Sequence, residues 1–462
     1  MDAPAVSVTP LQPETRNPAD RADRQKGIRR FTEVRRFAIV IVTLALIAAA
    51  CGDDESGPTE MQLIASDLER VASGASEEDL AAVARAEREF ATALYAILAE
   101  EEGDLVFSPV SIHLAMAMAL VGAEGDTETQ IAAALGLDDI APERMHDAMN
   151  ALDALLEARN RVEAPVPDGE ERKVEISIVN SLWGQSGFAF EQEFLDVLAA
   201  NYGAGMRVVD FKTAAEAARQ EINAWVAEQT NDRITELIPQ GAVDELSRLV
   251  LTNAVYLDAT WATPFDPDAT SDAEFTLLDG SVVSVSTMHG SISASYARGE
   301  GWQAVDLAYT GGEVSMLLIL PDEGRFADIE GALPAGLVDE VAAALSNTEV
   351  LISLPKFEIR TQADLNAALA ALGIVDAFDP DRADFTGIST VEPLYISGVL
   401  HEAFIAVDEA GTEAAAATAV IIGTTSAPIE VIAVDFDHPF LFVLQDRETG
   451  SVLFMGRVLD PR

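Results

Sequence analysis

The chain has 462 residues, of which 49% are apolar, 23% are charged and only one is cysteine, and its formal net charge at pH 7 is -49. A long chain with this apolar share can bury a large core, so the composition excludes a disordered protein, and the single cysteine excludes a disulfide framework and a multi-cysteine zinc site. The acidic excess would repel nucleic acid and anionic lipid headgroups. Such an acidic, lysine-poor chain fits either a high-salt habitat or an acidic bacterial lineage.

The first fifty residues predict an export signal. They carry eight basic residues against five acidic ones, and Arg35 and Arg36 run directly into the uncharged residues 37–50. That length suits the apolar region of a signal peptide and is short for a membrane span. The following Cys51 resembles the lipidated cysteine of a bacterial lipoprotein signal, and an ordinary secretory signal is the alternative. Translation starting near Val34 would fit this interpretation, and residues 52–60 are typical of a polar tether.

Helical patterns occupy much of the first half of the remaining chain. Residues 61–137 follow helical spacing, with a capping box at Ser76 and a fully apolar helix, Ile112–Val121, after Ser108-Pro109. Residues 213–238 predict an amphipathic helix. Between these, residues 160–172 are expected to form a loop and Lys173–Trp183 a strand.

Beyond Arg248 the pattern changes to strands. We expect them at Leu249–Leu257, Val282–Met288, Ala304–Tyr309, Val314–Leu320, Val350–Leu354, Val399–Val407, Phe440–Leu444 and Leu453–Val458. Early helices and late strands, without regular alternation or repeats, predict an α+β fold. We expect a signal segment at 1–50, a tether and first helical segment at 51–84, and one large domain at 85–462.

Enzyme motifs are absent from the sequence. There is no G-x-S-x-G elbow, no H-E-x-x-H and no Walker-type glycine loop, and the five histidines show no metal-ligand spacing. We therefore expect no catalytic residue, no metal and no cofactor. A hydrolase stays open at this point, because catalytic triads are assembled in space rather than in sequence.

The segment Asp408–Asp435 is unusual because it is too long for a normal connection between two strands. Read with a period of two, one face carries small or apolar side chains only: Thr412, Ala414, Ala416, Thr418, Val420 and Ile422. Such a face would allow the segment to enter a sheet as a strand. An alanine-rich helical turn is the alternative.

At this segment the sequence resembles the serpin family. The hinge of a serpin reactive-centre loop is matched by Gly411, Thr412, Glu413, Ala414, Ala415, Ala416, Ala417 and Thr418, with Glu409 resembling the carboxylate that anchors it. Other family motifs follow in order at Phe107–Ile112, Asn253–Leu257 with Trp261 and Pro264-Phe265, Leu354–Phe357, Asp384–Ile388, Asp437–Phe442 and Leu453–Val458. The resemblance covers the chain from about residue 85 to its end.

The resemblance implies a serpin fold with about eight to nine helices around three β-sheets and an exposed, metastable reactive loop at about 408–435. It implies a serine protease inhibitor in which the protease cleaves the loop, forms an acyl-enzyme and is trapped as the loop inserts as a strand. A non-inhibitory serpin-fold binding protein is the alternative. An arginine or proline on the inward face of the hinge would obstruct insertion, and this hinge has neither.

Further roles follow from the resemblance. The shutter, a buried polar cluster where the strands part, is expected to contain Ser108, Ser111, Asp210 and His401, and the breach, where insertion begins, is expected at Trp261. Asp210 stands where many members have Asn, which would place a carboxylate in the shutter. Asp258 stands where the family usually has Lys, and this replacement suggests a generally acidic surface.

The loop sequence predicts the class of target. Family spacing from the hinge places the reactive bond at Thr425–Ser426, with Ile422 and Thr424 in reserve, and counting from the C-terminal motif shifts it by about three residues. Residues 408–435 contain no Lys, Arg or aromatic side chain, so they suit neither a trypsin-like nor a chymotrypsin-like pocket. We expect a monomer, exported to the cell envelope or medium, that inhibits elastase-like or subtilisin-like proteases.

Overall fold

The computed structural model describes residues 61–138, 140–163, 172–412 and 432–462. The chain divides into the segment Met1–Ser56 and the unit Gly57–Arg462, and all described residues belong to the second. The expected signal peptide, Cys51 and the reactive bond lie outside the described residues.

The described part of the chain contains nine α-helices. The longest, α2 (Glu77–Leu98), begins at Ser76, whose hydroxyl accepts from the Asp79 amide as the capping pattern predicts. The other helices are α3 (Pro109–Leu120), α4 (Gly125–Ala134), α5 (Pro142–Glu157), α6 (Gln192–Val197), α7 (Phe211–Gln229), α8 (Phe326–Glu330), α9 (Leu337–Ala344) and α10 (Asn366–Ala371). Short turns are η2 (Leu198–Tyr202), η3 (Pro267–Ala269), η4 (Leu333–Ala335) and η5 (Asp376–Phe378).

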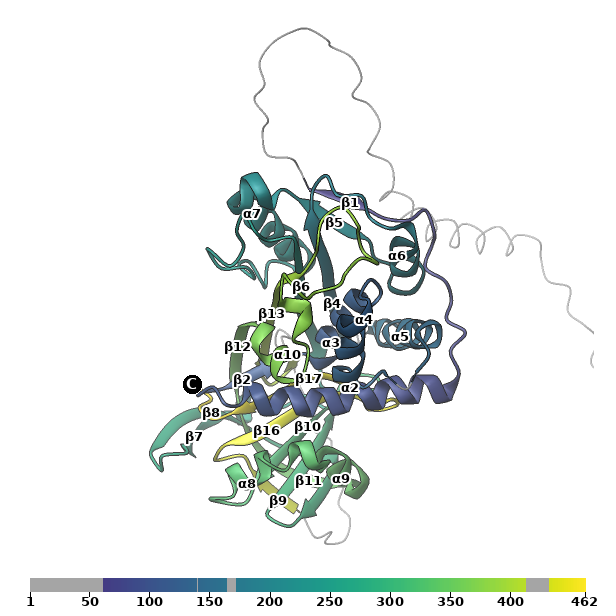
Figure 1. The fold of residues 1–462 in the computed structure, drawn as a ribbon. Coiled ribbons are helices and arrows are strands. Elements are labelled where there is room, and N and C mark those ends of the chain that lie inside the picture. Colours follow the sequence, from purple (N-terminus) through teal and green to yellow (C-terminus); the bar gives the residue numbers. More distant parts are fainter. Residues whose placement is uncertain (1–60, 139, 164–171, 413–431) are drawn as a thin grey trace, which may run out of the picture. The chain divides into compact units, whose positions relative to one another are not determined.

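One sheet, here called sheet A, contains eight strands of the described residues. Along the sheet they are β1 (Gln62–Ile64), β5 (Met206–Val209), β4 (Arg172–Gln185), β6 (Leu249–Thr260), β14 (Gly411–Thr412), β13 (Ile396–Val407) and β12 (Phe357–Asp364), with β3 (Arg161–Glu163) paired to β4. The long strands β4, β6 and β13 lie side by side (Figure 1). Strands distant in sequence therefore form the centre of the sheet.

Sheet B contains nine strands of the described residues. Their order is β15 (Ile432–Asp435), β11 (Ser346–Pro355), β8 (Val282–Gly299), β9 (Trp302–Ala308), β10 (Val314–Pro321), β16 (Phe440–Asp446), β17 (Val452–Val458) and β2 (Leu105–Phe107), with β7 (Ser271–Thr276) paired to β8. The described residues thus form two hydrogen-bonded sheets instead of the expected three, because β8 pairs with β7, β11 and β9 along its length and joins their strands into one network.

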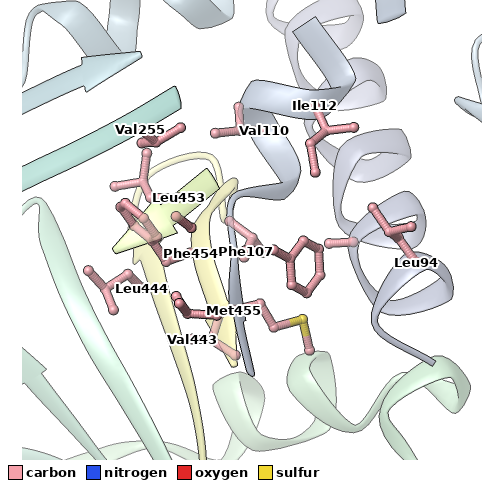
Figure 2. Close-up of a cluster of buried hydrophobic side chains, with 14 of the residues drawn as sticks. Leu94, Phe107, Val110, Ile112, Val255, Val443, Leu444, Leu453, Phe454 and Met455 are labelled. Atoms are coloured by element: carbon pink, nitrogen blue, oxygen red, sulfur yellow. The ribbon is translucent and has the colours of Figure 1, made fainter. Parts of the chain in front are cut away.

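The core lies where α2 and α3 meet both sheets (Figure 2). Every residue of α3 is buried, as expected from its apolar sequence. Figure 2 shows Leu94 of α2, Phe107 of β2, Val110 of α3, Val255 of β6 and Phe454 of β17 converging in this cluster. Strand β6 of sheet A therefore contributes to the same core as α2, α3 and β17 of sheet B.

Several elements differ from the sequence predictions, among them β3, which lies in the segment 160–172 expected to be a loop. The helix predicted to run to residue 238 ends at Gln229, because Asn231 and Asp232 take positive φ angles of 50° and 61° that a right-handed helix does not allow. Ile234 and Leu237 are nevertheless buried beside α7. Residues 61–75, expected to be helical, instead contain β1, which pairs with β5.

Candidate functional site

The two central strands of sheet A separate at one end. Residues 249–255 of β6 pair in parallel with residues 396–403 of β13. Beyond this region β14 lies between the strands and is antiparallel to both, so that Gly411 pairs with Thr260, and Thr412 pairs with Ala259 and Val407. The first two residues of the predicted hinge therefore already occupy strand positions in the sheet.

Gly411 has no room for a side chain. A Cβ at this position would lie 2.0 Å from the carbonyl oxygen of Ala259 and 2.9 Å from the Cα of Thr260. Both are backbone atoms of β6, which cannot yield as a flexible side chain would. The close approach of β14 to β6 explains why the first residue of the hinge is a glycine.

Thr412 is fixed by an aromatic pair. Its hydroxyl lies 2.6 Å from the Tyr309 hydroxyl, and the Tyr309 ring stacks on Trp261 with centroids 4.4 Å apart. The Trp261 indole N–H donates to the Asp408 carbonyl at 3.0 Å. Burial raises the pKa of Tyr309 far above its usual value in spite of the bond to Thr412, so the phenol stays neutral. Trp261 thus lies at the point where β14 enters the sheet.

Glu409 anchors the segment before β14. Its carboxylate accepts from the Lys356 ammonium at 2.8 Å and from the Thr270 hydroxyl at 2.8 Å. Burial alone would raise the pKa of Glu409, but these two bonds outweigh it and lower the pKa below its usual value. Glu409 is therefore charged at neutral pH. It holds the start of the hinge against Lys356, which lies between β11 and β12, and against Thr270, which directly precedes β7.

A second, buried cluster lies further along β6 and β13, where these two strands pair directly with each other. Asn180 of β4, Asn253 of β6 and His401 of β13 are register partners, so they form one row across three strands. The His401 Nδ1 bonds to the Asn253 side chain, and its Nε2 accepts from the backbone N–H of Ser108 at 3.2 Å. Ser111 Oγ donates to the Asn180 side chain at 3.0 Å. The row links the sheet to the start of α3.

His401 is neutral in this cluster. Burial lowers its pKa to about 3, against the opposing effect of the bond to Asn253. The Ser108 hydroxyl has no hydrogen-bond partner among the described residues. A strand placed between β6 and β13 would separate Asn253 from His401, so this cluster bears on the opening of the sheet.

The structure does not place Asp210 in this cluster. Asp210 is the N-cap of α7, where it accepts from the Thr213 amide at 3.1 Å, and from the Gln185 side chain at 3.2 Å. The positions that sequence reasoning missed are Asn180 and Asn253. Asn253 lies within one of the matched motifs, and a polar residue inside an otherwise apolar strand was the available signal.

Asp258 is buried rather than part of an acidic surface. It is 7% exposed, forms an ion pair with Lys173 of β4 and accepts from the Tyr256 hydroxyl at 3.1 Å. The acidic residue is therefore compensated by a lysine on the neighbouring strand, which the sequence pattern did not reveal.

Hinge residues from Glu413 to Thr418, the reserves Ile422 and Thr424, and the reactive bond Thr425–Ser426 lie outside the described residues. Within the described ranges, no group of three or more His, Cys, Asp or Glu side chains is arranged to bind a metal ion. The same ranges hold no helix that is both long and apolar enough to cross a bilayer.

Known proteins match this chain over most of its length. The sequence model of the family described as "Serpin (serine protease inhibitor)" matches residues 85–461. The chain belongs to the serpin family.

Individual serpins show how far the similarity extends. A serpin-like protein from Thermococcus kodakarensis is 38% identical over 384 residues, covering 82% of this chain and 86% of the relative. The leukocyte elastase inhibitor of Sus scrofa is 36% identical over 386 residues, covering 80% of this chain and 97% of the relative. The crystal structure of a thermophilic serpin, tengpin, in the native state superimposes with a TM-score of 0.75 at 28% identity, covering 87% of this chain and all of that one. The expected α+β serpin fold is thus confirmed.

Proposed function

We propose that this serpin is a suicide-substrate inhibitor of serine proteases. The protease cleaves the reactive loop, remains bound as an acyl-enzyme, and is trapped as the loop enters sheet A between β6 and β13. The observation that carries this proposal is β14, which pairs with β6 through both of its residues and with β13 through Thr412. Inhibition in general accords with the description of the family as serine protease inhibitors.

Insertion continues the register that β14 begins. Thr412 is buried on the inward side of the sheet, so a period of two directs Ala414, Ala416 and Thr418 inward as well. These are small side chains that a closely packed slot can accept. The parallel pairs between β6 and β13 are replaced by antiparallel pairs to the new strand, and the bond between Asn253 and His401 is broken.

The target is an elastase-like or subtilisin-like protease. Residues 408–435 offer Thr425 as the leading bait residue, with Ile422 and Thr424 as reserves, and no cation for a trypsin-like pocket. The leukocyte elastase inhibitor among the relatives supports this choice by its name alone.

An adduct experiment tests the proposal. The purified serpin is mixed with pancreatic elastase, subtilisin, chymotrypsin and trypsin, and the products are separated by denaturing electrophoresis. We expect a stable adduct with elastase or subtilisin. Clipped chain without adduct for all four proteases would favour the non-inhibitory binding protein instead, and trapping of trypsin alone would contradict the assigned bait residues.

We also propose that the protein acts outside the cytoplasm as a lipoprotein attached through Cys51. The basic and apolar residues before this single cysteine support the assignment. Cys51→Ala is expected to move the protein from the membrane fraction to the soluble fraction of the producing cells. Retention of this variant in the membrane fraction would contradict lipid attachment.

A further inference from the structure

Residues 61–75, here called the strap, precede both α2 and the part of the chain that matches the family. Their β1 pairs antiparallel with β5, with Gln62, Leu63 and Ile64 opposite Val208, Arg207 and Met206. The backbone N–H of Met61 also bonds to the Glu221 carboxylate of α7. The strap thus covers the edge of sheet A and is bound to the helix that packs on β4.

The other end of the strap is bound to α5 and η2. Arg70 donates to the Asn150 side chain at 2.8 Å and forms an ion pair with Asp153 at 2.7 Å. The Val71 N–H donates to the Ala200 carbonyl at 2.9 Å, and the Val71 carbonyl accepts from Asn150 at 2.9 Å.

A third set of contacts secures the strap on both sides of Arg70. The Ser66 hydroxyl donates to Asp196 of α6, the Ser73 hydroxyl donates to the Asp147 carbonyl at 2.8 Å, and the Gly74 N–H donates to the Asp147 carboxylate. The strap is therefore held to several elements by hydrogen bonds rather than by one contact.

These contacts join parts of the molecule that insertion moves apart. Neighbouring strands lie about 4.8 Å apart, so a new strand between β6 and β13 displaces β6, β4 and β5 by about that distance relative to β13. The strap follows β5 at one end. At its other end it is bound to α5, which packs on α2, and α2 packs on β17 of sheet B. Opening of sheet A would therefore strain the strap contacts that join β5 to α5.

The strap also lies over a cavity that reaches the polar row of sheet A. The cavity, of about 470 Å³, is lined by Leu63 and Arg70 of the strap, by Asn180 of β4 and by Arg207 of β5. Asn180 is the same side chain that bonds to Ser111 in the buried cluster. The strap and the polar row of sheet A thus border the same cavity.

We propose that the strap restrains sheet A and so prevents the uncleaved reactive loop from inserting spontaneously. This inference rests on the strand-insertion mechanism proposed above. The strap slows opening in the intact protein, whereas cleavage of the loop removes the constraint at the loop's far end and permits insertion in spite of the strap.

The first test weakens the strap at Arg70. Arg70→Ala is incubated without protease, and the remaining inhibitory capacity is measured over time against the protease that forms the adduct. We expect the same capacity as the unmodified protein at time zero and a loss of capacity at least about tenfold faster, with no cleavage of the chain. Asp67→Ala, which alters an exposed strap residue, is the matched control and should decay like the unmodified protein. Equal half-lives for Arg70→Ala and the control would overturn the proposal.

The second test strengthens the strap and does not depend on the stability of the first variant. Leu63 and Arg207 are register partners, whose Cα separation in an antiparallel pair suits a disulfide. Leu63→Cys with Arg207→Cys, in a Cys51→Ala background, is compared in its oxidised and reduced forms, which differ only in the cross-link. We expect the oxidised form to lose inhibitory capacity more slowly. Identical decay of the two forms would contradict the role of the strap.

The outcomes separate this inference from the proposed function. The adduct at time zero reports inhibition, and the rate of decay reports the strap. If no adduct forms with any protease, conversion of the uncleaved protein to a form with a higher unfolding temperature is followed instead. Conversion that is faster in Arg70→Ala than in Asp67→Ala supports the strap, and equal conversion rates refute it.

Discussion

At the scale of single residues, the central feature is the row formed by Asn180, Asn253 and His401 across three strands of sheet A. A buried polar group costs free energy unless it is hydrogen-bonded, and here the three side chains satisfy one another together with Ser111. Because insertion separates Asn253 from His401, the row makes opening of the sheet costly until new partners are supplied. Neutral His401 performs this role through hydrogen bonding and not through proton transfer.

The first prediction concerns the inward face of the hinge. Ala414→Arg should convert the inhibitor to a substrate, because an unpaired buried charge costs several kcal/mol on insertion. We expect the fraction of serpin that forms adduct to fall at least about tenfold while cleaved chain accumulates. Ala415→Arg, on the opposite face of the same predicted strand, is the matched control and should retain most adduct formation. Undiminished trapping by Ala414→Arg would contradict the register assigned to the loop.

The second prediction concerns Glu87, a buried carboxyl group of α2. One of its oxygens accepts from the Val452 N–H at 3.0 Å, and the other has no partner among the described residues. Burial raises the pKa of Glu87 to about 8, more than the opposing hydrogen bond and Arg88 lower it. Between pH 4.5 and about pH 8, the folded protein keeps a proton on Glu87 that the unfolded chain releases. The free energy of unfolding therefore decreases as the pH rises through this range.

Glu87→Gln should remove that dependence on pH. The stability of the unmodified protein should fall by up to about 1.4 kcal/mol per pH unit from this group, relative to the variant, between pH 5 and pH 8. Thermal unfolding temperatures of both proteins at intervals of one pH unit provide the measurement. A constant difference between the two proteins at every pH would show that Glu87 ionises normally.

At the scale of elements, the described start of the predicted hinge forms the strand β14, while part of its surroundings differs from the sequence predictions. The small residues beginning at Gly411 predicted a segment able to enter a sheet, and β14 pairs between β6 and β13. The pattern could not show β1, because a three-residue strand gives no period and its partner β5 is remote in sequence. Asp210 was misplaced because matching by motif gives a position in the chain, whereas its side chain caps α7. The position of Asn180 beside Asn253 and His401 depends on the register of three strands that are far apart in sequence, so the sequence pattern could not show it.

The third prediction concerns β14 as an element. Gly411→Val should prevent β14 from entering the sheet, because even a Cβ would lie 2.0 Å from the Ala259 carbonyl oxygen. Trp261 bonds to the Asp408 carbonyl and stacks on Tyr309 beside this strand, so its fluorescence should change. The same clash persists in a fully inserted loop, so adduct formation should fall as well. Unaltered fluorescence together with full inhibition would show that the two strands can separate to accept a side chain here.

At the scale of the whole molecule, β6 and β13 are hydrogen-bonded to each other along one part of sheet A and are separated by β14 at one end. Residues 249–255 of β6 pair directly with β13, whereas Ala259 and Thr260 of β6 pair with the two residues of β14 instead. In the proposed mechanism, the strap and the polar row oppose opening of sheet A, and the hydrogen bonds gained by an inserted loop favour it. Under the insertion mechanism proposed above, the uncut loop withholds a better-paired arrangement of the same chain.

The last prediction tests this stored free energy directly. Limited proteolysis near Thr425, with a protease that cleaves the loop without being trapped, should yield a nicked protein that is more stable than the intact one. Roughly ten new ladder bonds, at about 1 kcal/mol each, together with burial of small side chains, would raise the unfolding temperature by more than about 10 °C. The intact and nicked forms are compared by thermal unfolding, with nicked Ala414→Arg as the control in which insertion is obstructed. We expect a large rise for the nicked parent and little or none for the nicked variant. An unchanged unfolding temperature after cleavage of the parent would contradict insertion, and with it the inhibitory mechanism.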